Sequence, residues 1–247
     1  MMKFLIVANW KCNPKTISQA EKILKEYKPV KGIELIVCPP FPFIHQLKAK
    51  GAQDCFYQEG AFTGEISPAM LKSIGVCYVI VGHSERRNLF NETDEIVNKK
   101  VKAILQENMI PILCVGESAG ERENNQTFEI IARQVEKGIE GIAKDKIKNI
   151  VLAYEPIWSI GTGNFAPPEK IQEVRIFIKK KINKKYGDKA SGSVRIIYGG
   201  SVDSKNVASY LFDAGMDGVL VGNASLNVNE FNQMERRLIE PPRGILR

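Results

Sequence analysis

Short apolar runs recur along the whole chain, separated by longer amphipathic stretches. The runs are rich in β-branched residues and apolar at successive positions, which is typical of strands covered on both faces, as in a parallel sheet. Seven of them occupy residues 4–8, 35–38, 78–81, 112–115, 150–154, 195–198 and 219–221, and a weaker run at residues 54–57 fills the remaining gap. The pattern therefore predicts eight strands.

Between these runs, apolar residues repeat with the period of a helix. One stripe joins Ile171, Val174 and Ile178, and similar stripes begin at Ala20 and Val97. Helix start signals, a capping side chain or a proline in the first turn, agree with the stripes at Ser67-Pro68, Thr93 and Pro167-Pro168. Strands that alternate with helices predict an α/β fold, a (β/α)8 TIM barrel that occupies residues 1–247 as a single domain. A doubly wound open sheet is the alternative that periodicity leaves open.

Composition and charge narrow the class of protein. The 247 residues are 44% hydrophobic and 26% charged, which excludes a disordered or collagen-like chain. The 35 basic and 28 acidic residues leave a net charge of +7, which is compatible with an anionic small molecule or with nucleic acid. The densest basic group, residues 179–185, is interspersed with apolar positions as on the wet face of a helix. We therefore interpret it as surface and expect no nucleic-acid partner.

The cysteines and the length of the apolar runs indicate the cellular compartment in which the protein is expected. The five cysteines are odd in number, dispersed, and contain no C-x-x-C pair, so neither a disulfide framework nor a zinc site is expected. The apolar runs fall far below the ~18 residues of a membrane span, so no membrane partner is expected. These features predict a cytoplasmic protein.

In a barrel, functional residues follow the strands, because the loops at the carboxyl ends of the strands build the active face. Polar and glycine-rich groups stand at five of these positions. They are Asn9-Trp10-Lys11, residues 82–87, Glu155-Pro156, Gly199-Gly200-Ser201 and Gly222-Asn223.

Four side chains in these groups are suited to proton chemistry. Glu155 directly follows a predicted strand, where partial burial would raise its pKa and make it a usable base; a structural acid is the alternative. His83 precedes a predicted helical turn, which favours a neutral imidazole that donates to a developing oxyanion; a structural histidine is the alternative. Lys11 would bring a fixed positive charge, or else be a solvated lysine, and Glu85 is a possible carboxylate partner.

The segment after Glu155 is apolar and glycine-rich, which is unusual for a permanent surface loop. We predict a lid that folds over a bound ligand and excludes water. It comprises Pro156, Ile157, Trp158, Ser159, Ile160, Gly161, Thr162, Gly163, Asn164, Phe165 and Ala166.

The glycines after the last strands are suited to holding a phosphate through backbone N–H groups. Gly161 and Gly222 would contribute in this way, and Ser201 adds a hydroxyl. Two histidines and dispersed cysteines provide no metal-ligand set, so we expect chemistry without a metal or a cofactor.

These segments, in their order along the chain, resemble the triosephosphate isomerase family. The matching stretches are residues 8–13, 60–67, 82–87, 114–117, 153–163, 198–202 and 220–226. The resemblance implies metal-free interconversion of dihydroxyacetone phosphate and D-glyceraldehyde 3-phosphate through an enediolate, in glycolysis and gluconeogenesis.

The resemblance also implies a role for each site residue. Glu155 would move the proton, His83 would act as a neutral electrophile, and Lys11 with Asn9 would stabilise negative charge. This family is itself the standard example of such an acid/base pair and of a lid that closes over the substrate. Glu85 would belong to the same site. The substrate phosphate would be held by Gly161, Ser201, Gly222 and Asn223.

The family resemblance further implies a homodimer in which the loop around Thr63 inserts beside Asn9 and Lys11 of the neighbour. The interface would include Gln53, Asp54, Phe62, Thr63 and Glu65. The chain departs from the family pattern at Asp54, where Asn is usual, at Asn164, where Lys is usual, and at Asn223, where Gly is usual.

Two other functions remain open from the residues. Another phosphate-binding barrel enzyme, a sugar-phosphate epimerase or a synthase, would keep the glycine-rich loops but lack the combined Lys11, His83 and Glu155 set. A non-catalytic protein that binds an anion or nucleic acid would be indifferent to the loss of Glu155.

Overall fold

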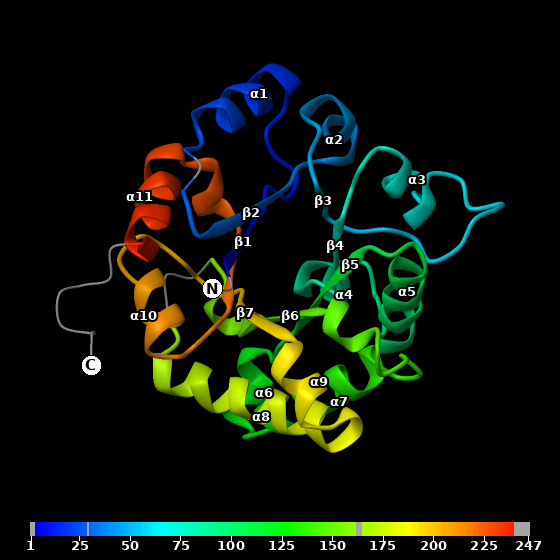
Figure 1. The fold of residues 1–247 in the computed structure, drawn as a ribbon, viewed down its shortest axis with the longest axis vertical. Coiled ribbons are helices and arrows are strands. Elements are labelled where there is room, and N and C mark those ends of the chain that lie inside the picture. The colour runs from blue at the N-terminus through cyan, green and yellow to red at the C-terminus, as the bar shows by residue number, and fades with distance from the viewer. Residues whose placement is uncertain (1–2, 29, 162–164, 240–247) are drawn as a thin grey trace.

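Eight parallel strands form one sheet that curls into a nearly closed barrel (Figure 1). The computed structural model describes residues 3–28, 30–161 and 165–239. The strands are hydrogen-bonded in the order β2-β1-β8-β7-β6-β5-β4-β3. Their bounds are β1 (Phe4–Asn9), β2 (Ile33–Cys38), β3 (Gly51–Ala52), β4 (Tyr78–Val81), β5 (Ile110–Val115), β6 (Val151–Tyr154), β7 (Arg195–Tyr198) and β8 (Gly218–Val221).

The helices surround this sheet, as the ribbon in Figure 1 shows. The α-helices are α1 (Ile17–Glu26), α2 (Phe41–Leu47), α3 (Pro68–Ser73), α4 (Ser84–Leu89), α5 (Asp94–Gln106), α6 (Ala119–Glu123), α7 (Thr127–Gly138), α8 (Pro168–Tyr186), α9 (Asp188–Ser193), α10 (Val207–Phe212) and α11 (Val228–Ile239). Short 3-10 helices are η1 (Ile147–Asn149), η2 (Ile157–Ser159) and η3 (Asn223–Leu226). The predicted barrel is confirmed, and the doubly wound alternative is wrong.

The predicted third strand at residues 54–57 is also wrong, because β3 lies earlier in the chain. A Cβ on Gly51 would lie 2.4 Å from the Cys38 sulfur and 2.8 Å from Ile36 Cγ2, so the backbone of β3 packs directly against β2. This contact brings the two ends of the sheet together. Only glycine permits such an approach, and Gly51-Ala52 gives almost no strand signal in the sequence.

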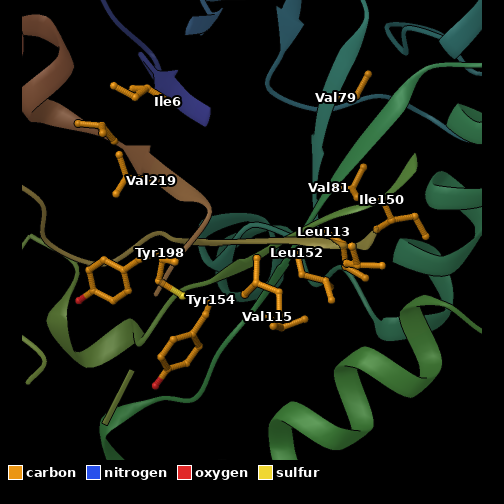
Figure 2. Packing of buried hydrophobic residues seen from close by; sticks show 14 of the residues in the cluster. Ile6, Val79, Val81, Leu113, Val115, Ile150, Leu152, Tyr154, Tyr198 and Val219 are labelled. Atoms are coloured by element: carbon orange, nitrogen blue, oxygen red, sulfur yellow. The ribbon is translucent and has the colours of Figure 1, made fainter. Parts of the chain in front are cut away.

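Successive residues of each strand pack into two different clusters. Leu5, Val7 and their equivalents in other strands form a cluster made almost entirely of strand residues, inside the barrel. The alternate residues, such as Ile6, pack with helix residues in the larger cluster between barrel and helices, part of which is drawn in Figure 2. Burial on both sides explains why the strands read as continuous apolar runs.

The helices begin where the start signals predict. Ser67 Oγ accepts from Met70 N ahead of α3, and Thr93 Oγ1 accepts from Ile96 N ahead of α5. Pro168 occupies the first turn of α8. Among the described residues, no helix combines the length and the apolar character that crossing a bilayer requires.

Candidate active site

The polar segments after β1, β4, β6, β7 and β8 meet around one cavity at the carboxyl ends of the strands. Its volume is about 200 Å³, which suits a small metabolite. Lys11, His83, Glu155, Ser201 and Gly222 all line it. The structure therefore brings these predicted residues together at the mouth of the barrel.

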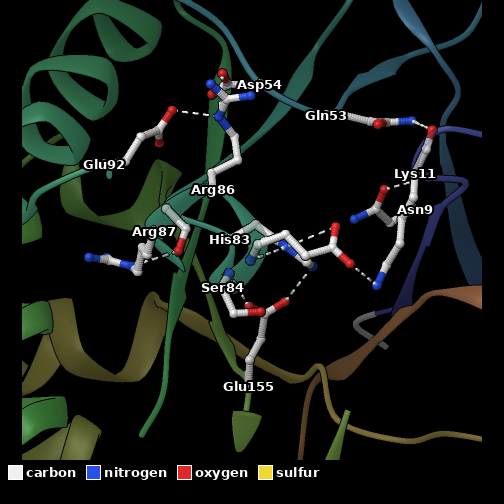
Figure 3. Close-up of polar contacts among 12 residues, drawn as sticks. Asn9, Lys11, Gln53, Asp54, His83, Ser84, Arg86, Arg87, Glu92 and Glu155 are labelled. Carbon is white, nitrogen blue, oxygen red and sulfur yellow. Dashed lines mark hydrogen bonds and ion pairs between the residues drawn. The ribbon is translucent and has the colours of Figure 1, made fainter. Parts of the chain in front are cut away.

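His83 is held at the start of α4 by its own ring. Its Nδ1 accepts a hydrogen bond from Glu85 N at 3.2 Å, so the hydrogen-bond pattern assigns the imidazole proton to Nε2. This Nε2 lies 3.4 Å from Oε1 of Glu155 (Figure 3). The donor end of the ring therefore faces the carboxylate across the floor of the cavity.

Glu155 is 2% exposed and follows β6 directly. Its Oε2 accepts from Ser84 N at 3.3 Å, whereas no hydrogen bond reaches Oε1 within the described part of the chain. Burial, and then the nearby carboxylate, raises the pKa of the Cys114 thiol, so this neighbour stays uncharged. One carboxylate oxygen is thus anchored by a backbone amide, and the other faces His83.

Two glycines make room for Glu155, and sequence reasoning assigned this role to neither. A Cβ on Gly116 would lie 1.8 Å from the Glu155 carbonyl oxygen. A Cβ on Gly199 would lie 2.8 Å from Glu155 Cγ and 3.3 Å from Oε1. The position of the carboxylate therefore depends on the absence of side chains on both neighbouring strands.

Lys11 has a positive φ of 52°, and two amides fix its backbone. Its N–H donates to Asn9 Oδ1 at 3.0 Å, and its carbonyl accepts from Gln53 Nε2 at 2.8 Å. The ammonium reaches Glu85 Oε1 at 2.6 Å. These contacts place a cation at the cavity, close to His83, as Figure 3 shows.

The four residues expected at the phosphate come together in space. Gly161, Ser201, Gly222 and Asn223 line the same cavity as Lys11. The Ser201 hydroxyl donates to Ser159 O, which ties this loop to the lid segment. These glycines and short polar side chains therefore line the cavity together with Lys11.

The amino-terminal half of the lid segment is attached to a buried carboxylate. Trp158 Nε1 donates to Glu117 Oε1 at 3.0 Å, and the Arg122 guanidinium lies 4.1 Å from the Trp158 ring centroid. Tyr154 donates to the same carboxylate, and burial raises the Glu117 pKa despite these donors. Ile160 and Phe165 line the cavity, whereas Thr162, Gly163 and Asn164 lie outside the described residues.

The residues expected at a dimer interface divide into two groups. Gln53 is bound to the backbone of its own chain, and Asp54 is 6% exposed. Phe62, Thr63 and Glu65 are exposed on the loop between β3 and α3. Other large apolar side chains are also exposed, among them Met70 in α3 and Leu89 and Phe90 at the end of α4.

Asp54 belongs to a buried ion cluster that the sequence did not reveal. Its carboxylate lies 2.7 Å from Lys100 Nζ and 2.8 Å from Arg86 Nε, and both cations also contact Glu92. Burial, only partly offset by Lys100, raises the Asp54 pKa to about 6. The donors that this unusual carboxylate requires therefore come from its own chain.

Within the described residues, no three His, Cys, Asp or Glu side chains are arranged to hold a metal ion. The cavity instead offers a buried carboxylate, an N–H donor and an ammonium. This combination can move a proton next to a carbonyl group and stabilise the resulting oxyanion.

A family model and several relatives agree in the family to which this chain is similar. The family model described as triosephosphate isomerase matches residues 4–238. Proteins named triosephosphate isomerase from Dictyoglomus turgidum (strain DSM 6724 / Z-1310) and Alkaliphilus oremlandii (strain OhILAs) are 45% and 47% identical, each over 94% of this chain and 98% of the relative. The protein of that name from Clostridium tetani (strain Massachusetts / E88) is 44% identical over 94% of this chain and 95% of the relative.

Proposed function

Because the chain belongs to the triosephosphate isomerase family, we propose that Glu155, His83 and Lys11 carry out its isomerisation. The chain is an isomerase that interconverts dihydroxyacetone phosphate and D-glyceraldehyde 3-phosphate in glycolysis. The observation that carries the residue assignment is the 3.4 Å approach of His83 Nε2 to Glu155 Oε1 in a cavity that Lys11 also lines.

In the proposed mechanism, Oε1 of Glu155 removes a proton from the carbon beside the carbonyl group. The carbonyl oxygen gains negative charge, which the Nε2–H of His83 and the Lys11 ammonium stabilise. His83 Nε2 gives its proton to this oxygen and takes the hydroxyl proton from the oxygen on the neighbouring atom of the carbon chain. Glu155 returns the carbon-bound proton to the adjacent carbon, so that the carbonyl group and the hydroxyl group exchange places. The second oxygen of Glu155 remains on Ser84 N, so that the base keeps its orientation through the cycle.

Lys11 is held at the cavity by a carboxylate. Its ion pair with Glu85 keeps the ammonium at the site, and because Glu85 is partly exposed, the pair costs little to loosen when an anion arrives. Asn9 supports this lysine by accepting from its backbone N–H.

The phosphate would lie on the Gly161, Ser201, Gly222 and Asn223 side of the cavity. Holding this group fixes the carbon skeleton under Glu155, so that binding energy is used for orientation. The lid at residues 156–166 would exclude water and protect the enediolate from losing its phosphate.

Turnover in deuterium oxide tests this assignment. The parent protein should place solvent deuterium on the product carbon, and Glu155→Gln should abolish both the exchange and the net isomerisation. Glu169→Gln, at the exposed start of α8, is the matched control and should exchange like the parent. Exchange that persists in Glu155→Gln would contradict the role of Glu155. A folded parent without isomerase activity would favour another phosphate-binding barrel enzyme or a non-catalytic anion binder.

We also propose that the chain forms a homodimer and works as one barrel domain in the cytoplasm. The exposed Phe62, Met70, Leu89 and Phe90 support dimerisation, since an interface would cover large apolar side chains of this kind. The five free cysteines are compatible with a reducing compartment.

A further inference from the structure

A dense group of lysines lies at the end of the barrel opposite the cavity. The connections that lead into the amino ends of β6 and β7 carry it, together with the neighbouring ends of α5 and α8. We call this group the basic end; its members are Lys102, Lys144, Lys146, Lys148, Lys184, Lys185 and Lys189.

Contacts between these connections show that the basic end is one continuous surface. The ammonium of Lys102 lies 3.2 Å from where a Cβ on Gly141 would stand, and that of Lys144 lies 3.6 Å from the equivalent point on Gly187. Lys146 Nζ donates to Asn108 Oδ1 at 3.1 Å. Three separate connections therefore meet here, and α7, α8 and α9 lie side by side in Figure 1.

Among the residues that the structure describes, no ion pair neutralises a lysine of the basic end. In the described ranges, the ion-paired lysines are those at positions 11, 100, 137, 170 and 181, none of which belongs to this group. The acids among these connections are Glu107, Glu140, Asp145 and Asp188, four against seven lysines, and Glu140 pairs with Lys137 outside the group. Five of the seven lysines are exposed, and only Lys102 and Lys146 are half-buried.

Helix stabilisation does not explain this arrangement. Lysines are favourable at helix carboxyl ends, which accounts for Lys184 and Lys185. Lys144, Lys146 and Lys148 lie in or beside η1, however, and Lys189 lies in the first turn of α9, where a cation is unfavourable. Nor does substrate capture explain it, because the group faces away from the cavity.

The sequence pattern alone favours a solvated helix face for residues 179–185 and no nucleic-acid partner. Because the structure places lysines of other segments beside this face, we propose instead that the basic end binds the phosphate backbone of a nucleic-acid duplex without sequence preference. Lysines neutralise phosphates and release counterions, which supplies affinity without apolar contacts. The group contains no arginine for bidentate contacts to bases and no exposed aromatic ring on which unpaired bases could stack. It also lacks the exposed apolar side chain that peripheral membrane binding usually adds to a basic patch.

The test is fluorescence anisotropy with a labelled DNA duplex of about two helical turns, titrated at several NaCl concentrations between about 50 and 200 mM. The parent should bind with an affinity that falls steeply with salt. The triple variant Lys144→Gln/Lys148→Gln/Lys189→Gln should bind at least about tenfold more weakly at the lowest salt, with a salt slope smaller by about 1 for each lysine that contacts phosphate.

A charge-matched control separates this surface from general basicity. Lys22→Gln/Lys25→Gln/Lys205→Gln removes the same charge from exposed positions elsewhere and should bind like the parent. Equal weakening in both triple variants, or no duplex binding by the parent, would overturn the proposal. Binding of the parent to phosphatidylserine vesicles in preference to the duplex would also overturn it.

Isomerase activity is an independent readout in the same experiment. Both triple variants should keep the parent kcat and KM, because none of the changed residues lines the cavity. This proposal therefore stands or falls separately from the assignment of Glu155 and His83.

Discussion

The Nε2 atom of His83 lies 3.4 Å from Oε1 of Glu155, although the two residues come from the ends of different strands. His83 is oriented by the amide of Glu85, and Glu155 by the amide of Ser84. Both anchors belong to the first turn of α4. One helix start therefore sets the relative position of the proposed base and the proposed hydrogen-bond donor.

Shortening the base tests how strictly this geometry matters. Glu155→Asp keeps the charge but withdraws the carboxylate by about one C–C bond, and a misplacement of ~1 Å can cost about 100-fold in rate. We expect kcat to fall by that order in a coupled triose phosphate assay, with little change in KM. Glu169→Asp is the control, and equal rates for the parent and Glu155→Asp would refute the assignment.

A substitution of Gly199 should lower kcat as strongly as a substitution of a residue that reacts directly. In Gly199→Ala the new Cβ would lie 2.8 Å from Glu155 Cγ, so the glutamate must move out of position. We expect kcat to fall by about 100-fold while the protein remains folded by circular dichroism.

Gly192→Ala is the matched control for this substitution. A Cβ there meets nothing within 4 Å, and the residue lies in α9. It should keep parent activity and gain about 0.5–1 kcal/mol of stability, because alanine favours helix over glycine. If Gly199→Ala retained full activity, the steric argument would fail.

Removing the Lys11 charge should damage catalysis and spare stability. Lys11→Met deletes the ammonium at the cavity, and losing one stabilising group for an oxyanion typically costs about 100- to 1000-fold. The melting temperature should hardly change, since the lost ion pair with Glu85 is partly exposed. Lys22→Met should leave both quantities unchanged; a large drop in melting temperature for Lys11→Met would instead indicate a structural role.

The proposed dimer predicts different outcomes for two exposed phenylalanines. Phe62 is 37% exposed and Phe128 is 43% exposed, but only Phe62 lies on the loop proposed to insert into a neighbour. Phe62→Asp should shift the protein from dimer to monomer in sedimentation velocity and lower its activity, whereas Phe128→Asp should remain dimeric. A monomeric parent would refute the dimer.

The buried side chain of Glu235 should make the stability of the folded protein depend on pH. The side chain is fully buried, neither oxygen has a hydrogen-bond partner within the described residues, and burial raises its pKa from 4.5 to about 7. Because the folded state holds this proton more tightly, its contribution to stability is complete below pH 4.5 and is lost as pH rises through 7. The total loss is up to about 3 kcal/mol.

Glu235→Gln should therefore melt at a higher temperature than the parent at pH 8, and the difference should vanish near pH 4.5. Replacing an exposed carboxylate, as in Glu123→Gln, should change the melting temperature little at either pH. A difference for Glu235→Gln that did not depend on pH would contradict this account.

Much of the fold was accessible from the sequence because strands buried on both faces must be apolar throughout. Seven of the eight predicted strands overlap observed ones, and helices occur at all three stripes. The third strand was missed because it consists of Gly51-Ala52, whose role is close approach to β2 and not side-chain packing. A pattern of apolar side chains cannot reveal a glycine whose role is to let two backbones pack closely.

For the candidate site, too, the sequence predicted some features and left others undetermined. The position of a residue directly after a strand was enough to single out Lys11, His83 and Glu155, since parallel strands of a barrel all end at one mouth. What only the tertiary structure decided were the contacts between distant segments. It assigned the proton of His83 through Glu85 N, the room for Glu155 through Gly116 and Gly199, and the donors of Asp54 through Lys100 and Arg86. The spacing of apolar residues along the sequence indicates which face of a helix or strand is buried. The contacts of His83, Glu155 and Asp54 depend instead on which helices and strands lie side by side in the folded chain.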